Sequence, residues 1–196
     1  MDSLDLLYEV LGQIQNGIFS GTLDNVCTSL YEQHLDSSTR LKEMFDRIRR
    51  IDWQQFNEEC VNLIIERYDT LEKTKEHRPV KAIYYEYDLD NGWSGAFFFC
   101  NDYNPIRNVD DDGFIDDDWA CDYCDDFDAP ELPYLPSSGI FYDEEGSNDA
   151  LHYAIAELTR NFVAVNDYLH KVRPEIPNLF IAFHDQTPIT RLSIEN

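Results

Sequence analysis

Residues 147–169 read SNDALHYAIAELTRNFVAVNDYL and carry the most regular hydrophobic pattern in the chain. Large apolar side chains recur there at steps of four and three, a spacing that places them on one face of an α-helix. They are Leu151, Ile155, Leu158, Phe162, Val165 and Leu169. Ser147 is suited to cap the start of this helix, and Pro174 follows its end. We therefore expect one long C-terminal helix, followed by a buried strand at 179–183.

The first third of the chain has the same helical period. Apolar stripes lie within residues 4–14, 23–30, 41–51 and 56–71. For the first helix, Ser3 is the expected cap and Gly17 the expected stop. Asp52, with a glutamine three residues later, matches a capping box that would open the fourth helix. We expect this fourth helix to fade after residue 71.

The period then changes to that of strands. Residues 80–87 and 96–100 are rich in aromatic and β-branched side chains, and Asn91-Gly92 between them is a hairpin turn signal. The polar stretch at 101–150 is too long for a structureless loop, so we expect it to be mostly ordered, with a short strand near 139–142. The predicted class is α+β, with N-terminal helices, a central antiparallel hairpin or small sheet bearing a long acidic loop region, one long C-terminal helix and a final strand.

Composition limits the classes of function. The 196 residues are 43% hydrophobic and 14% aromatic, which excludes global disorder and suits a single domain over 1–196. Apolar runs are strand-sized, far short of a membrane span, and the start has no basic head of a secretory signal. The net charge of −24 disfavours direct contact with nucleic acid phosphates. We expect a cytoplasmic protein without a cofactor.

The charge is concentrated in the middle of the chain. Residues 1–79 hold 15 acidic and 9 basic side chains, residues 80–150 hold 19 and 2, and residues 151–196 hold 5 and 4. Like charges at this density repel one another and cost stability. The middle segment is therefore expected to meet something cationic, unless it is merely a solvated loop.

The acidic stretch is the strongest candidate site. Clustered carboxylates steer a basic partner and speed its association, while interleaved aromatic rings supply the buried contacts that hold it. The predicted partner-binding residues are Asp110, Asp111, Asp112, Asp116, Asp117, Asp118, Trp119, Asp122, Tyr123, Asp125 and Asp126. The competing interpretation is an acidic loop whose aromatic side chains pack on the protein's own core.

The same stretch contains two candidate metal sites, one for calcium and one for zinc. Residues 108–115 resemble the start of an EF-hand calcium loop, but Trp119 stands where that loop needs a bidentate glutamate. Cys121 and Cys124 form a single C-x-x-C, and zinc needs four ligands. The count of five cysteines is odd and suggests a reducing compartment. Cys27, Cys60 and Cys100 lie on apolar faces and are expected in the core.

Signals for catalysis are weak. Gly92-Trp93-Ser94-Gly95-Ala96 resembles a nucleophile elbow, but its last glycine comes one place early and a strand follows instead of a helix. His184-Asp185 is a possible polar pair, whereas His152 and His170 fit packing positions. Arg47, Arg49 and Arg50 form the basic cluster, which we expect on a solvated, salt-bridged helix face. The sequence therefore favours a protein that is not an enzyme.

Together these features resemble the immunity proteins that bacteria make against their own polymorphic or contact-dependent toxins. The residues that carry the resemblance are Tyr84-Tyr85-Glu86-Tyr87-Asp88, Trp93, Phe97-Phe98-Phe99-Cys100 and the Asp-rich stretch up to Asp128. The resemblance implies a small, cytoplasmic, non-catalytic inhibitor. It also implies a toxin partner, for many such toxins are nucleases with basic clefts.

The leading hypothesis is thus an inhibitor that neutralises a basic partner, most concretely a cognate toxin of the nuclease type. A nucleic-acid mimic that sequesters a DNA-binding or restriction protein is the first alternative, and it would need carboxylates arrayed with phosphate-like spacing. A metal-dependent hydrolase using the Asp cluster is the second, and it would need carboxylates and a histidine in one cleft. A plain structural domain, acidic for solubility alone, is the third.

Replacing Asp116, Asp117 and Asp118 together with asparagine tests the acidic stretch. We expect weaker partner binding and a flatter dependence of affinity on salt, because three steering charges are lost, with folding intact. Titration calorimetry at two salt concentrations measures both quantities. Unchanged affinity would place the site elsewhere in the chain.

Overall fold

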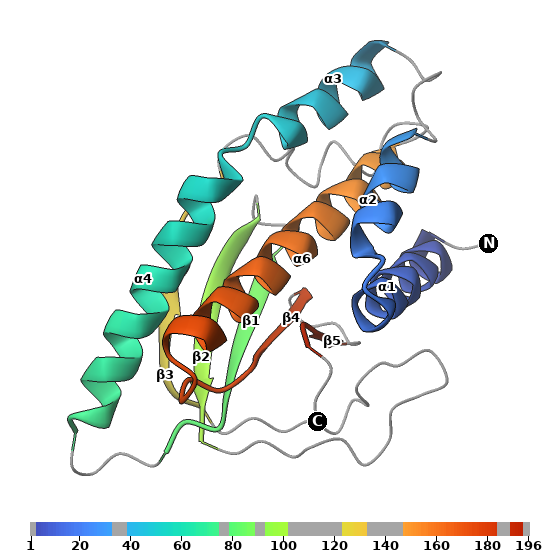
Figure 1. Cartoon of the computed structure of the whole chain (residues 1–196). Helices are drawn as coiled ribbons and strands as arrows, with labels where there is room; N and C mark the ends of the chain where they lie inside the picture. The colour runs from blue at the N-terminus through green and yellow to red at the C-terminus, as the bar shows by residue number, and fades with distance from the viewer. Residues whose placement is uncertain are drawn as a thin grey trace.

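The computed structural model describes residues 3–32, 39–74, 79–88, 93–101, 123–132, 147–183 and 189–193. Their fold is α+β, as predicted (Figure 1). The elements are α1 (Ser3–Ser20), α2 (Leu23–Glu32), α3 (Thr39–Arg49), α4 (Trp53–Glu72), β1 (Ala82–Asp88), β2 (Ser94–Cys100), β3 (Tyr123–Asp128), α6 (Ser147–Val172), β4 (Leu179–Phe183) and β5 (Thr190–Arg191). None of the helices within these residues is long and apolar enough to cross a membrane.

Two glycines explain how α1 ends. The helix runs through Gly17, which was expected to stop it, and finishes at Ser20. Gly17 serves a different purpose, because a Cβ there would lie 3.0 Å from Cγ2 of Val26 on α2. It lets the two helices approach closely. The stop is Gly21, whose φ of 68° suits glycine and reverses the chain.

The predicted cap of α4 is confirmed. Asp52 is the N-cap, and its Oδ1 accepts a hydrogen bond of 3.0 Å from the backbone N–H of Gln55. The side chain of Gln55 donates instead to Glu59, at 2.7 Å. The helix ends at Glu72, as the loss of its apolar stripe indicated.

The described strands form a five-stranded mixed sheet in the order β3-β2-β1-β4-β5. The predicted hairpin is present, with β1 and β2 antiparallel and Tyr85 opposite Phe97. β4 lies parallel to the other side of β1, which places β1 at the centre. β3 pairs antiparallel with β2 inside the stretch that was expected to be an acidic loop. The expected strand at 139–142 lies outside the described residues.

The helices cover one face of the sheet (Figure 1). α6 crosses the sheet. α4 packs on one side of α6, and α1 and α2 pack on the other side of α6. Side chains alternate between the two faces of a strand. Ile83, Tyr85 and Tyr87 of β1 therefore join the core beneath the helices, together with Phe97 and Phe99 of β2.

Most aromatic residues that carry the resemblance to immunity proteins thus serve packing. Tyr85, Tyr87 and Phe97 are buried, and Trp93 stacks on Tyr87 with ring centroids 5.8 Å apart. The opposite face of the sheet carries a smaller cluster, in which Tyr84 and Phe98 are half-buried.

The three cysteines expected in the core are all buried. Cys27 and Cys60 are free thiols, but Cys100 takes part in a disulfide. The odd cysteine count had suggested reduced thiols throughout, and for Cys100 the structure differs from that expectation.

α6 is the centre of the packing. Every residue from 150 to 159 is buried, so this part of the helix is enclosed on all sides. Phe162 is fully buried and its ring meets Tyr85 of β1 at a centroid distance of 4.2 Å. The same ring lies 5.9 Å from Phe56 of α4 and 6.0 Å from Phe97 of β2. One side chain therefore joins two helices and the two strands of the hairpin.

Phe162→Ala is expected to lower the free energy of unfolding by about 3–5 kcal/mol, because it opens a cavity where these elements meet. Urea denaturation followed by circular dichroism measures the change. Tyr168→Ala on the same helix is the control, since Tyr168 is 52% exposed and its loss should cost less than about 0.5 kcal/mol. Similar costs for the two variants would contradict this account of the core.

Candidate functional site

Most of the predicted acidic site lies outside the described residues. This holds for Asp110, Asp111, Asp112, Asp116, Asp117, Asp118, Trp119 and Asp122, and for the calcium-like loop at 108–115. Tyr123 begins β3, and Asp125 and Asp126 lie within it. The described part of the acidic stretch is therefore the strand β3, at one edge of the sheet.

Two of the three predicted site residues in β3, Asp125 and Asp126, lie on opposite faces of the sheet. Phe127 lies opposite Phe97 and is buried on the helix-covered side. Asp126 and Asp128 flank it, are exposed, and therefore belong to the opposite face. Asp125 lies opposite Phe99 and is half-buried. Because side chains in a strand alternate, Asp125 and Asp126 do not form one patch, whereas Asp126 and Asp128 do.

Two further carboxylates share the face of Asp126 and Asp128. They are Glu86 and Asp88 of β1, both half-buried. Glu86 accepts a hydrogen bond of 3.3 Å from the hydroxyl of Tyr84. We call Glu86, Asp88, Asp126 and Asp128 the acidic sheet face.

The other sequence candidates are dispersed. His152 is buried in α6 and His170 is half-buried near its end, as packing positions would be. His184, Asp185 and Cys121 lie outside the described residues. Ser94 of the elbow-like segment starts β2, so a strand follows it and not a helix. Within the described ranges, no group of three or more His, Cys, Asp or Glu side chains is placed to hold a metal ion.

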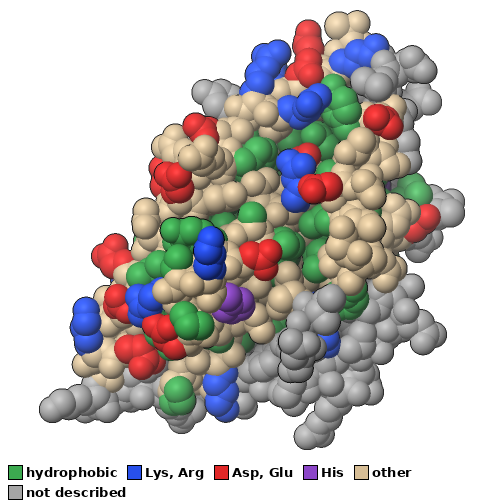
Figure 2. Space-filling view, in the orientation of Figure 1, with side chains coloured by type: hydrophobic (Ala, Val, Ile, Leu, Met, Phe, Trp, Pro, Cys, Tyr) green, Lys and Arg blue, Asp and Glu red, His purple; other side chains and the backbone are tan. Residues whose placement is uncertain are grey.

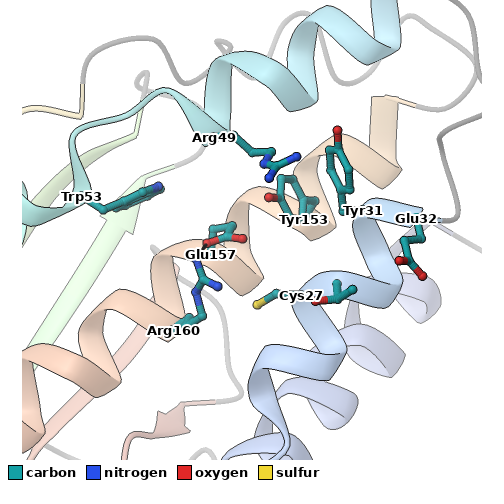
Figure 3. Close-up of a pocket in the computed structure, with 9 residues that line it drawn as sticks. Cys27, Tyr31, Glu32, Arg49, Trp53, Tyr153, Glu157 and Arg160 are labelled. Carbon is teal, nitrogen blue, oxygen red and sulfur yellow. Dashed lines mark ion pairs between the residues drawn. The ribbon is translucent and has the colours of Figure 1, made fainter.

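On the helical side, a cavity of about 520 Å³ opens between α2, α6 and the junction of α3 with α4 (Figure 3). Figure 2 shows this side of the molecule, with hydrophobic side chains gathered along it and charged groups set among them. The cavity is lined by Cys27, Thr28, Tyr31, Glu32, Arg49, Trp53, Tyr153, Glu157 and Arg160. A second cavity, of about 660 Å³, lies between α4 and α6.

Aromatic rings build the wall of the first cavity, which we call the Glu157 cavity. Tyr31 and Tyr153 lie with ring centroids 5.7 Å apart, and Phe45 stacks behind Tyr153 at 5.0 Å. The guanidinium of Arg49 lies over the ring of Tyr31, 4.5 Å from its centroid. Such a cation–π contact holds an exposed arginine in place.

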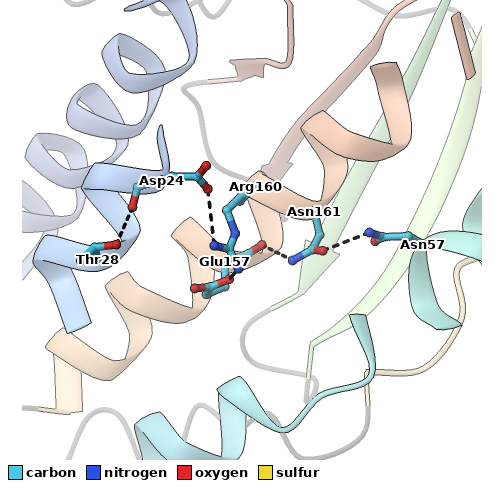
Figure 4. Close-up of polar contacts among 6 residues, drawn as sticks. All are labelled: Asp24, Thr28, Asn57, Glu157, Arg160 and Asn161. Carbon is cyan, nitrogen blue, oxygen red and sulfur yellow. Dashed lines mark hydrogen bonds and ion pairs between the residues drawn. The ribbon is translucent and has the colours of Figure 1, made fainter. Parts of the chain in front are cut away.

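Glu157 is the buried charge of this cavity, and its side chain is 6% exposed. Its Oε2 lies 2.5 Å from Nη2 of Arg160, and Nη1 of Arg160 reaches Asp24 of α2 at 3.5 Å (Figure 4). The backbone carbonyl of Glu157 accepts a 2.8 Å hydrogen bond from the Asn161 side chain. Asn161 in turn accepts a 3.0 Å bond from Asn57 of α4. This chain of contacts connects α2, α6 and α4.

Burial governs the protonation of Glu157. Loss of solvent raises the pKa of its carboxyl, and the nearby charge of Arg160, a hydrogen bond from Tyr153 and the charge of Arg49 oppose that shift without cancelling it. Asp24 adds to the upward shift. The ionised carboxylate is thus less well tolerated in the fold than in the unfolded chain.

The Cys27 thiol and the Tyr153 hydroxyl of the cavity are not activated. Burial, and then the charge of Glu157, raise the pKa of the Cys27 thiol to about 12, so it stays protonated at neutral pH. Burial also raises the pKa of Tyr153, which keeps its proton. Since the reactive form of cysteine is the thiolate, the described walls of this cavity favour binding over nucleophilic chemistry.

Sequence reasoning did not identify this cavity. Tyr153, Glu157 and Arg160 follow one another at steps of four and three, so they form a second stripe on α6 beside the apolar one. A glutamate within a run of apolar and alanine residues was the available signal. Its partners on α2 and α3 depend on tertiary packing, which a helical period does not specify.

Glu157→Gln tests the pH behaviour of this carboxyl. Its folded pKa lies above the unfolded value, so folding favours the proton and the stability of the wild type should fall as pH rises from about 4.5 through the folded pKa. The variant lacks this titration, so its free energy of unfolding relative to the wild type should increase with pH and level off. Thermal unfolding between pH 4.5 and 7.5 measures the difference. A difference that shrinks with pH would contradict the raised pKa.

Comparisons with models of protein families, with curated proteins and with solved structures give no match for this chain. The candidate sites of this chain therefore rest on two features of its own structure. They are the acidic sheet face beside the acidic stretch and the Glu157 cavity on the helical side.

Proposed function

We propose that this chain is a non-catalytic inhibitor that binds and neutralises a basic protein, most concretely a cognate bacterial toxin of the nuclease type. The acidic stretch of the sequence extends into the sheet as strand β3. The observation that carries it is the acidic sheet face, where the exposed carboxylates Asp126 and Asp128 of β3 lie opposite uncharged residues of β2.

The strand register places uncharged residues opposite the two carboxylates of β3. Asp126 lies opposite Phe98, and Asp128 lies opposite Ala96. Asp126 and Asp128 therefore have no lysine or arginine opposite them in β2, the strand with which β3 pairs among the described residues. A cross-strand cation is a common way to stabilise such a residue, and a cationic partner would take that role here.

Aromatic side chains accompany these carboxylates. The rings of Tyr84 and Phe98 lie 5.9 Å apart on the same face, and both are half-buried. Phe98 lies directly opposite Asp126, so ring and charge are neighbours. Charge of this kind raises the rate of association, while apolar contacts slow dissociation. The combination suits an inhibitor that must both find and retain its target.

A nuclease offers a matching surface. It must present lysine and arginine side chains to hold the phosphates of its substrate. Carboxylates placed over those side chains occupy the same contacts and exclude nucleic acid. An inhibitor acting in this way needs no catalytic group.

The test uses the full chain and a basic C-terminal domain of a secreted protein encoded beside it. We expect the two to co-purify and the chain to abolish the activity of that domain. Asp126→Asn combined with Asp128→Asn should lower the association rate at low salt several-fold, up to about tenfold, and reduce its salt dependence. Stopped-flow fluorescence measures the rate.

The matched control removes two charges elsewhere. Glu59 and Glu66 are exposed on α4, which covers the helical side and does not belong to the acidic sheet face. Glu59→Gln combined with Glu66→Gln should leave the rate within about twofold of the wild type, because only charges near the interface steer effectively at moderate salt. Equal slowing by both double variants would indicate an effect of net charge alone. No association with the basic domain would contradict the proposal.

A further inference from the structure

The Glu157 cavity lies on the helical side, and the proposed inhibitor function does not use it. Its volume of about 520 Å³ falls within the usual size of small-molecule sites, roughly 300–1,000 Å³. The walls combine guanidinium cations, aromatic rings, the buried carboxylate of Glu157 and the exposed carboxylate of Glu32. Each kind restricts the chemistry of the molecule that can enter.

The cations reach the cavity from separate helices. Arg49 comes from the last turn of α3 and Arg160 from α6. Arg49 is exposed, and the side chain of Arg160 is 42% exposed, so both keep donors that a ligand can reach. These groups form a local site for an anion on a chain whose net charge is −24.

The rings define a slot for a planar group. Figure 3 shows the nitrogen end of the Trp53 indole directed toward Tyr153 and Arg49, with the ring of Tyr31 beside that of Tyr153. Tyr153 is held from behind by Phe45, so this wall is rigid. Aromatic walls of this kind favour stacked or edge-on aromatic ligands.

The carboxylate supplies an acceptor. Glu157 is 5% exposed, yet its Oε2 has no hydrogen-bond partner among the described residues. Arg160 is close enough for an ion pair but not aligned for a hydrogen bond. Besides this ion pair, Oε2 has a further lone pair that can accept from an N–H donor brought by a ligand.

We propose that the Glu157 cavity binds a small aromatic anion, in which a planar ring with an N–H donor carries a carboxylate or phosphate group. The ring lies among Trp53, Tyr31 and Tyr153, the anionic group meets Arg49 and Arg160, and the ring N–H donates to Glu157. This inference does not depend on the acidic sheet face.

The opposite ligand charge is the competing possibility. A basic side chain of a protein partner would also find rings and a carboxylate in this cavity. It would, however, meet two guanidinium groups, one of which already pairs with Glu157. Two compounds with the same indole ring and opposite charge separate these possibilities: indole-3-acetate and tryptamine.

The experiment is titration of the full chain with each compound, followed by ligand-observed NMR and calorimetry. Indole-3-acetate should bind with a Kd below about 1 mM, and tryptamine at least tenfold more weakly. 1-Methylindole-3-acetate lacks the N–H and should bind at least threefold more weakly than indole-3-acetate. Guanosine 5′-monophosphate is the phosphate arm, and its binding relative to indole-3-acetate shows which anionic group the cavity prefers.

A matched pair of arginine variants locates the binding. Arg49→Gln should weaken binding of the better anion at least fivefold. Arg47→Gln changes the same charge on the same helix at an exposed position that does not line the cavity, and it should leave binding unchanged. Circular dichroism confirms that both variants fold. Tighter binding of tryptamine, equal effects of the two variants, or no binding of either anion at 5 mM would overturn the proposal.

Discussion

The burial of α6 is the constraint on which the other elements depend. Residues 150–159 of α6 are enclosed on all sides and need partners on every face, and the sheet, α4 and the N-terminal helices pack against this helix. Phe162 marks the meeting point, since its ring touches side chains of α4, β1 and β2. Dispersion and hydrophobic contacts of this kind are individually small and collectively dominant.

Burial also determines the contacts of the polar residues of α6, because a buried polar group must find a partner within the protein. Asn166 accepts a 2.9 Å hydrogen bond from the backbone N–H of Leu179 and so fixes the start of β4. Asn161 bonds to Asn57 and connects α6 to α4. Glu157 pairs with Arg160, which extends to α2. The same residues that satisfy the helix therefore shape the cavity beside it.

The two sides of the molecule differ in character for a related reason. Alternation along the strands sends Tyr85, Phe97 and Phe127 beneath the helices and leaves Asp126 and Asp128 on the opposite face. The aromatic density of the middle segment, which contributed to the resemblance to immunity proteins, is thus largely explained by core packing. The carboxylates are not explained in this way, and they carry the proposed function.

Periodicity in the sequence was sufficient for α6, for the N-terminal helices, for the hairpin and for β4. It failed at β3, because Tyr123–Asp128 is rich in aspartate, which has low strand propensity, and this strand is held by pairing with β2. The prediction that Gly17 ends α1 was also wrong, because the role of Gly17 depends on the close approach of α2. The parallel pairing of β1 with β4 and the Glu157 cavity join segments that are distant in sequence, so neither could be derived from local patterns.

Hydrogen–deuterium exchange on the full chain, with and without a basic toxin domain encoded beside it, tests most directly where a partner binds. We predict slower amide exchange in β3 and in the flanking acidic stretch, with no change in α2 or in the first half of α6. Protection confined to α2, α3 and α6 would show that the partner binds the helical side, and would contradict the assignment of partner binding to the acidic sheet face.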